Sequence, residues 1–300
     1  MEFTMYFAGS QGEDFDKEMV DMGCDRLFSQ LNDKKHISKH LELTENKPTK
    51  TLIDSGAYSV VSSGKTVDID KYIEYMEAIG DRVTFFANLD VIPLSDEHQE
   101  LLRCADEGFI NFEYIYAKST FRDKLCAVYH EGEPFEVLER YVNFYKEHPS
   151  MHYIALGGVV DSSAPSTYEF CRKNCLYIKK HLPYAKIHLF GYTRLNDLQT
   201  INCDSVDSTT WIKASIYGTI ITPWGRLNVS DRRAGERDSI HNLPVDARNR
   251  VYDFIENMGF TVDEVRNDPK KRVAYNVKYL LDWCKNYKYA PRKVNKKSLI

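Results

Sequence analysis

Two aspartates in the stretch CDSVDSTTW, Cys203 to Trp211, raise a chemical question. Asp204 and Asp207 stand three positions apart in a run of small and β-branched residues that otherwise predicts a strand. Aspartate is depleted in strands, and burying an unpaired carboxylate costs on the order of several kcal/mol or shifts its pKa. A turn or a satisfied hydrogen-bond network would explain the pair. A carboxylate nucleophile that holds a sugar while one group leaves and another enters is the functional alternative.

Two further aspartates stand where apolar runs end. Asp54 follows TLI and Asp90 follows FFANL, much as Asp207 follows SV. For each of them alone, a helix cap or a loop hydrogen bond is the alternative, because aspartate is favoured at caps. Three acids at three strand ends indicate one shared site if the strands are parallel and end at the same face.

The elements that would position these acids are strand-like runs that alternate with segments of helical period. The runs are Thr4 to Gly9, Arg26 to Gln30, Thr51 to Ser59, Arg82 to Ile92, Lys124 to His130, His152 to Val160, Ala185 to Thr193 and Cys203 to Trp211. Helical faces are formed by Ile69, Ile73, Met76 and Ile79, by Phe135, Leu138, Val142 and Tyr145, and by Val251, Phe254, Ile255 and Met258. This pattern predicts an α/β protein, a (β/α)8 TIM-like barrel, with a doubly wound open sheet as the alternative.

The predicted domains are a β/α barrel over residues 1–240 and a basic helical extension over residues 241–300, packed on the barrel. In such barrels the carboxyl ends of the strands face the active site. Asp54, Asp90 and Asp207 would therefore converge on one mouth. The rim would also carry His130, the glycines Gly157 and Gly158, and the segment His188 to Gly191.

Composition predicts a soluble cytoplasmic protein. The 300 residues are 43% hydrophobic, and the segment MEFTMYFAGSQGEDF has neither a basic leader nor a long apolar stretch. No apolar run approaches membrane-spanning length, so we expect no membrane contact. Seven cysteines, an odd number without paired spacings, fit a reducing compartment better than a disulfide framework.

The carboxy-terminal third is basic. Residues 201–300 contain 18 Lys and Arg against 12 Asp and Glu, a net of +6, whereas residues 1–200 contain 22 against 32, a net of −10. The densest segments are Arg266 to Arg272 and Lys285 to Lys297. Such segments neutralise phosphates, and tyrosines beside them can stack on bases. A solvated tail is the alternative interpretation.

The residues at the strand ends carry a resemblance. DSGAYS, FANLDVI, ALGGVV, HLFGYT and DSVDSTTW, in this order, resemble the active-site motifs of the tRNA-guanine transglycosylase superfamily. The first motif of that family usually has a second glycine where this chain has Ala57. These enzymes cut the glycosidic bond of a guanosine in a polynucleotide and insert a 7-deazaguanine base.

The resemblance implies catalytic roles for two aspartates, with Asp207 as nucleophile and Asp54 as general acid/base. Asp90 would accept hydrogen bonds from the ring N–H and the amino group of a guanine-like base. The other base-binding residues that the resemblance implies are Tyr58 and Phe190, which sandwich the base, and Gly157 and Gly158, which let it approach the main chain. The chemistry suits these residue types, because a single acid can give a proton to the leaving base and then take one from the incoming base.

The chain departs from the tRNA enzymes in the region that follows the barrel motifs. Those enzymes have a zinc site of three clustered cysteines and a histidine, but after Trp211 this chain has only Cys284 and His241. Cys171 and Cys175 lie in phase with apolar helix positions, so we interpret them as core residues. We expect no metal and no cofactor, with the 7-deazaguanine base as co-substrate.

These departures, with the short chain and the form DSVDSTTW, favour the phage and bacterial DNA-guanine transglycosylases, which place bases such as 7-cyano-7-deazaguanine into DNA. We therefore expect DNA rather than tRNA as partner, in a bacterial or phage-infected cytoplasm. The alternatives are a tRNA-guanine transglycosylase and a non-catalytic nucleic-acid-binding subunit of the same fold. A barrel lyase or aldolase would need a Schiff-base lysine or a metal cluster at the strand ends, and the sequence has neither at those positions. His130 could touch ribose or phosphate, or be a hydrogen-bonded structural histidine.

Overall fold

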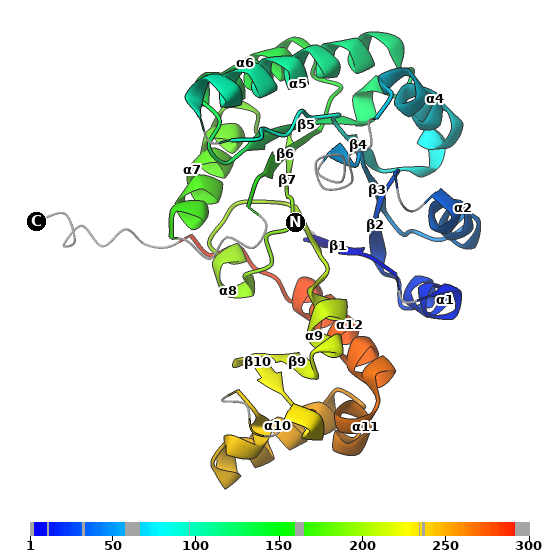
Figure 1. Ribbon diagram of the computed structural model, residues 1–300, viewed down its shortest axis with the longest axis vertical. Coiled ribbons are helices and arrows are strands. Elements are labelled where there is room, and N and C mark those ends of the chain that lie inside the picture. The colour runs from blue at the N-terminus through cyan, green and yellow to red at the C-terminus, as the bar shows by residue number, and fades with distance from the viewer. Residues whose placement is uncertain are drawn as a thin grey trace, which may run out of the picture. The chain divides into compact units, whose positions relative to one another are not determined.

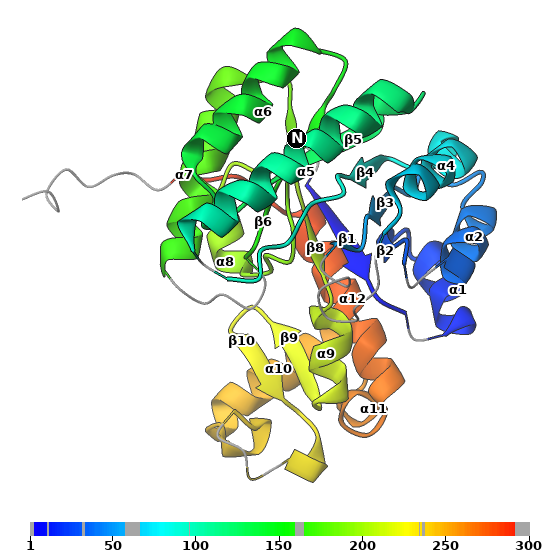
Figure 2. The ribbon, with the colours of Figure 1, turned by 45° about the horizontal axis from the view of Figure 1, so that its top comes forward.

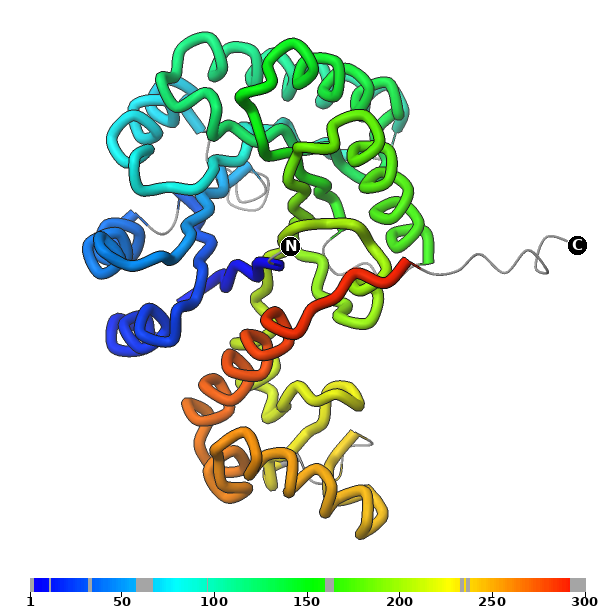
Figure 3. The backbone as a smooth tube through the Cα atoms, turned by 180° about the vertical axis from the view of Figure 1, so that it is seen from behind, coloured from blue at the N-terminus to red at the C-terminus, as the bar shows by residue number. Residues whose placement is uncertain are grey.

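The protein forms a closed barrel of parallel strands, as seen in a computed structural model (Figure 1). The structure describes residues 3–10, 12–31, 34–57, 67–95, 97–159, 165–233, 235 and 238–291. The barrel order β1-β2-β3-β4-β5-β6-β7-β8 follows the chain, and the strand–helix alternation can be followed along the backbone in Figure 3. The predicted (β/α)8 barrel is confirmed, and the open-sheet alternative is wrong because the sheet closes.

The barrel elements have the following bounds. The strands are β1 (Thr4–Ala8), β2 (Asp25–Ser29), β3 (Thr51–Asp54), β4 (Phe85–Ala87), β5 (Leu125–His130), β6 (Tyr153–Gly157), β7 (Lys186–Leu189) and β8 (Ser205–Ser208). The helices between them are α1 (Glu13–Asp21), α2 (Lys34–Leu43), α4 (Ile69–Ile79), α5 (His98–Lys118), α6 (Phe135–Glu147), α7 (Pro165–His181) and α8 (Leu195–Leu198). Figure 2 shows α4 to α7 on the outside of the strands that they connect.

Each of the eight strands lies within or beside its predicted run, but most are shorter than the run. The run from Arg82 to Ile92 contains only Phe85–Ala87 as ladder, and the run that begins at Thr51 leaves the sheet after Asp54. Beyond Asp54 the chain turns through Gly56, whose φ of 82° is a left-handed conformation that glycine adopts without strain. Past β4, Leu89 is buried in the loop that follows the strand, whereas Val91 and Ile92 are half-buried.

The barrel interior is filled by alternate residues of the strands. The inward cluster consists of Tyr6, Leu52, Phe85, Ala87, Cys126, Val128 and Ala155, with Leu27, Tyr153 and Phe190 packed against it. Because successive side chains of a strand point to opposite faces, the intervening residues face the helices. The helices also bond to the strands: Tyr72 of α4 donates its hydroxyl to the Ala87 carbonyl at 2.7 Å.

The predicted helical faces are largely confirmed. Leu138, Val142 and Tyr145 are buried on α6, but Phe135 at the start of that helix is 42% exposed. Cys171 and Cys175 on α7 are both fully buried, as expected of core positions. The described part of the chain contains no helix that is long and apolar enough to cross a membrane.

The chain divides into two compact units. Within the described residues, one unit comprises Tyr6–Asp207 and residues 288–291, and the other comprises residues 3–5 and Ser208–Tyr287. The division thus comes directly after Asp207, whereas the sequence placed it at residue 240. The difference arises because a hairpin and α9 (Thr210–Ile216), neither of which the sequence pattern indicated, belong to the second unit. The hairpin pairs β9 (Thr219–Thr222) with β10 (Gly225–Asn228).

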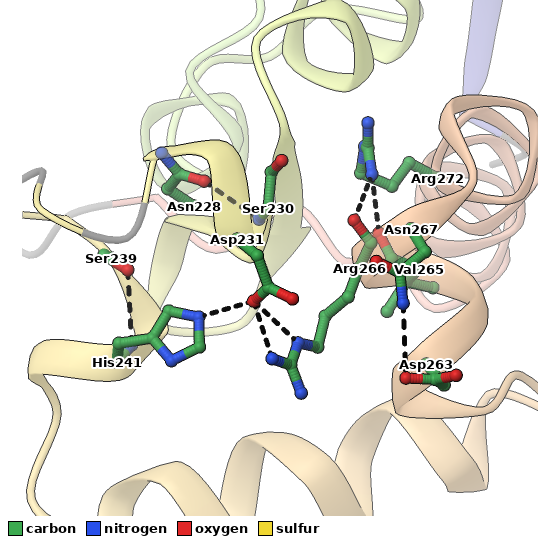
Figure 4. A network of polar contacts seen from close by, with 10 residues as sticks. All are labelled: Asn228, Ser230, Asp231, Ser239, His241, Asp263, Val265, Arg266, Asn267 and Arg272. Carbon is green, nitrogen blue, oxygen red and sulfur yellow. Dashed lines mark hydrogen bonds and ion pairs between the residues drawn. The ribbon is translucent and has the colours of Figure 1, made fainter.

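The second unit is completed by α10 (Val245–Asn257), α11 (Val262–Asn267) and α12 (Pro269–Lys285). Arg272 of α12 is buried and donates to the carbonyl oxygens of Ser215, Val265 and Arg266. Arg266 itself donates to Asp231 at 2.6 Å, and Asp231 also contacts His241 at 2.9 Å (Figure 4). Two of the basic residues in the Arg266 to Arg272 segment therefore have partners within the protein.

Candidate active site

The candidate site lies at the carboxyl ends of the strands, where the inward positions of the barrel become polar. Inward Leu52 is followed two residues later by Asp54, and inward Val128 by His130. On β6, inward Ala155 is likewise followed two residues later by Gly157. Strands β3 to β8, which carry the predicted residues, are consecutive neighbours in the barrel (Figure 2). Alternation therefore directs the polar residues into one ring.

The next two strands, β7 and β8, contribute Phe190 and Asp207 to this ring. Phe190 follows β7, packs against the interior cluster and donates its amide to the Leu156 carbonyl at 2.9 Å. Asp207 is the third residue of β8, whose Val206 is paired with Leu189. Phe190 and Asp207 are each one residue beyond a paired position, so they have the same orientation on adjacent strands.

Asp90 lies in a charged cluster at the ends of β4 and β5. Its Oδ1 accepts from Asn88 Nδ2 at 2.8 Å, and its Oδ2 is 3.5 Å from His130 Nε2. Asn88 is fully buried and also donates to the Gly108 carbonyl of α5 at 2.9 Å. Asp90 is thus anchored through Asn88 to a helix outside the barrel.

Glu133 holds His130 from the other side. One carboxylate oxygen of Glu133 is 3.0 Å from His130 Nδ1, and the other accepts from the His130 backbone amide at 2.9 Å. Burial alone would lower the pKa of His130, but the hydrogen bond with Glu133 and the charges of Asp90 and Glu133 raise it to about 9. His130 is therefore an imidazolium at neutral pH.

The pKa of Asp90 is raised to about 7, chiefly by burial. The charge of His130 and the hydrogen bond from Asn88 oppose this rise, whereas the nearby carboxylates of Glu133 and Asp54 add to it. Asp90 therefore titrates in the physiological range. Its proton occupancy near pH 7 depends on its burial and on the charges that surround it.

Asp54 is half-buried at the end of β3, and its Oδ2 accepts from the Gly56 amide at 3.2 Å. Tyr72 of α4 is fully buried, which raises the pKa of its phenol well above the usual value, and the charges of Asp54 and Asp90 raise it further. Asp54 thus belongs to the same electrostatic environment as Asp90.

Asp207 is held in another way, on the β7–β8 side. Its Oδ1 accepts from the Gly191 amide at 2.6 Å and lies 3.4 Å from Nε2 of His188. The other aspartate of the stretch, Asp204, instead accepts from Lys179 Nζ at 2.6 Å and from the Ile187 amide at 2.7 Å. Asp204 is a structural carboxylate, whereas Asp207 points into the ring.

The two predicted glycines are required by close contacts. A Cβ on Gly157 would lie 2.7 Å from His130 Cδ2, so the imidazole occupies the space beside it. Gly158 has a φ of 75°, and a Cβ there would lie 3.0 Å from the Glu131 backbone nitrogen. Gly158 is exposed, which leaves its main chain open at the rim.

Of the two aromatic residues predicted to sandwich a base, Phe190 lies within the described residues. The Phe190 ring is half-buried and meets the His188 ring edge-on, with centroids 4.5 Å apart. Tyr58 lies outside the described residues. One face of the predicted base site is therefore described.

Sequence reasoning assigned no role to Asn88 or Glu133, and it mentioned His188 only as part of the rim. The available signals were spacings: Asn88 is two residues before Asp90, Glu133 is three after His130, and His188 is two before Phe190. Structural interpretation of His130 as a hydrogen-bonded residue is consistent with its contact to Glu133. The same histidine also contacts Asp90, which makes it part of the candidate site.

The residues present do not fit the zinc site of the tRNA enzymes. His241 Nε2 lies 2.9 Å from Asp231 Oδ1, and Cys284 is a residue of α12. Within the described ranges, no three His, Cys, Asp or Glu side chains gather as a metal site would require. The expectation of a zinc-free protein remains a prediction, and elemental analysis of purified protein should find less than one zinc per chain.

Neither a family model nor a curated protein matches this chain. The fold and the site define it as a (β/α)8 barrel whose strand ends carry three carboxylates and an imidazolium.

Proposed function

We propose that the protein is a transglycosylase that replaces guanine in DNA with a 7-deazaguanine, such as 7-cyano-7-deazaguanine, through a covalent bond between Asp207 and the sugar. The main support is the geometry of Asp207. Its carboxylate projects from an inward position of β8 and uses Oδ1 for the Gly191 amide. In the same ring stand Asp54 and Asp90, two acids with distinct surroundings.

The proposed exchange has two matched steps. Asp207 attacks C1′ of the target nucleotide while the bond from C1′ to N9 of guanine breaks, and Asp54 gives its proton to the departing base. The incoming base then returns a proton to Asp54 as its N9 displaces Asp207 from C1′. Atoms and charges balance, and inversion at each step gives retention overall.

Asp90 is the proposed reader of the base. A carboxylate can accept both the ring N–H and the amino group of a guanine-like edge. The His130 imidazolium at 3.5 Å favours the anionic form that this acceptor role needs. Glu133 in turn keeps His130 protonated, and the charge of His130 then favours the anionic form of Asp90.

DNA is favoured as polymer by the form of the motifs and by the poor fit of a zinc site. The target base must leave the stack before Asp207 can attack it, at a cost of about a few kcal/mol. Phosphate contacts must offset that cost. The basic residues that follow α12 are the proposed source, because Arg266 and Arg272 are committed within the protein.

The test is to incubate the protein with labelled guanine and duplex DNA, single-stranded DNA or tRNA, and to measure which polymer acquires label. Label in DNA supports the proposal, and preferential label in tRNA would move the assignment to the tRNA enzymes. Binding to a polynucleotide without any exchange would support the alternative of a non-catalytic subunit.

Deleting residues 292–300 tests the phosphate contacts, because this segment carries Arg292, Lys293, Lys296 and Lys297 but leaves Tyr287 stacked on Phe3. Each lost phosphate contact should flatten the slope of log affinity against log salt by about 0.7–0.9. Exchange at saturating DNA should be largely retained. An unchanged slope over a salt series would show that this segment does not contact DNA.

A further inference from the structure

Resting on the proposed base exchange, we propose that His188 is a positioning residue that, together with the Gly191 amide, holds Oδ1 of Asp207, so that Oδ2 is the oxygen that bonds to the sugar. His188 lies on β7 and is completely buried.

The surroundings of His188 fix its ring without satisfying it. Rings of Tyr6, Phe85 and Phe190 meet the imidazole edge-on, with centroids 5.7, 5.6 and 4.5 Å away. Nδ1 is 2.9 Å from Ser205 Oγ. Among the described residues Nε2 has no hydrogen-bond partner, and Asp207 Oδ1 lies 3.4 Å from it. A buried polar atom is thus aimed at the proposed nucleophile.

The direction of the Ser205 hydrogen bond follows from the charge of Asp207. A lone pair on Nε2 would face a carboxylate oxygen and be repelled, whereas an Nε2–H group would be attracted to it. Ser205 therefore donates its hydroxyl proton to Nδ1, and Nε2 carries the hydrogen. The 3.4 Å separation is longer than an ordinary hydrogen bond, as is common for reacting groups before substrate binds.

Two donors on one oxygen give the carboxylate a defined chemical orientation. Oδ1 receives the Gly191 amide and faces Nε2–H, while Oδ2 is left to attack C1′ as the C1′–N9 bond breaks. In the covalent intermediate Oδ1 is then the carbonyl oxygen of the ester. When the incoming base displaces Asp207, the electron pair of the C1′–Oδ2 bond returns to the carboxylate, and both donors stabilise the charge that develops.

The kinetic test uses His188→Phe, which keeps an aromatic ring but removes the N–H, and His188→Gln, which keeps an N–H donor. We expect His188→Phe to lower kcat for exchange by about 10- to 100-fold, the range for losing a hydrogen bond to a charged group. KM for DNA and for the base should stay unchanged. Single-turnover rates of adduct formation and breakdown should both fall, and His188→Gln should recover part of each.

The matched control is His40→Phe. His40 is also a buried histidine of the barrel unit, 2% exposed, with Nε2 3.1 Å from Thr51 Oγ1 and its ring 5.1 Å from Phe28. It lies on α2, away from the carboxyl end of the strands. Both variants could reduce the yield of folded protein. If each keeps the wild-type kcat per folded molecule, His188 is only a packing residue and the proposal is overturned.

A second measurement does not depend on activity or on the folding of a variant. Nitrogen-15 NMR of the wild-type imidazole should show a protonated Nε2 and an unprotonated Nδ1. A proton on Nδ1 with a bare Nε2 would overturn the proposal even in an active enzyme. If the wild type exchanges no base on any polynucleotide, the proposed function fails, while the NMR result still decides whether His188 orients Asp207.

Discussion

The two sides of the barrel mouth hold their carboxylates by different means. On the β4–β5 side, Asp90 lies beside the His130–Glu133 pair, and its pKa is raised to about 7 by burial and by neighbouring charges. On the β7–β8 side, Oδ1 of Asp207 accepts a hydrogen bond from a backbone amide and lies 3.4 Å from Nε2 of a buried imidazole. One side controls the charge of an acid, and the other controls its orientation.

This difference matches what each proposed role requires. A carboxylate that reads two N–H groups must be anionic when the base arrives. A carboxylate nucleophile must present one oxygen to C1′. The difference therefore fits the proposed roles, base recognition for Asp90 and bond formation for Asp207, and each role can be tested separately.

The largest expected effect separates the two acids. Asp207→Asn should abolish the covalent adduct and lower exchange by at least about 10⁴-fold, because an amide does not form the glycosyl ester. Asp90→Asn should lower kcat/KM for the base by about 100-fold and leave the adduct detectable. Denaturing gels with labelled DNA measure the adduct, and Asp246→Asn, on an exposed position of α10, is the control. Adduct in Asp207→Asn, or its loss in Asp90→Asn alone, would reverse the assignments.

A smaller effect concerns the positive charge of His130 beside Asp90, on the β4–β5 side. His130→Gln removes the imidazolium that opposes the raised pKa of Asp90, so that pKa should rise above about 7. The anionic form is then populated only at higher pH, and the acid limb of kcat/KM for the base should move upward. The profile is measured with varied free base at saturating DNA.

His152→Gln is the matched control for this pH profile, because His152 is an exposed histidine just before β6. Its profile should coincide with that of the wild type. An unmoved acid limb in His130→Gln would show that Asp90 is not the group that limits base recognition.

The smallest effect is on folding stability. The pKa of His130 is about 9 in the folded protein against an ordinary value near 6.5, so the folded state binds its proton more tightly. The stabilisation from His130 is therefore fully present below about pH 6.5 and is lost as pH rises through 9. From His130 alone, the free energy of unfolding, wild type minus His130→Gln, should fall by about 3 kcal/mol between pH 6 and pH 9.5.

Urea unfolding at these two pH values measures that difference. Asp90 offsets part of this fall, because its pKa rises further in His130→Gln and the variant then also loses stability as Asp90 ionises above about pH 7. A difference that stays constant from pH 6 to 9.5 would show that His130 is not charged by its contacts.

Much of the barrel could be predicted from local patterns. Strand-like runs such as Lys124 to His130 alternate with helical faces such as that of α6, and parallel strands joined by helices form few architectures. The positions of Asp54, Asp90 and Asp207 at strand ends could be predicted for the same reason. The hairpin of β9 and β10 and the division after Asp207 could not, because short elements of the second unit carry weak periodic signals.

By itself, the sequence determined which residues stand at the strand ends and that Asp204 and Asp207, three apart, differ in strand parity. Only the tertiary structure decided which of the two faces the interior, because Lys179 arrives from α7 to bind Asp204 and the Gly191 amide to bind Asp207. The contact between Asp90 and His130 was decided in the same way, because His130 comes from the neighbouring strand. Charge state and orientation depend on burial and on groups distant in the chain, and these exist only once the barrel has closed.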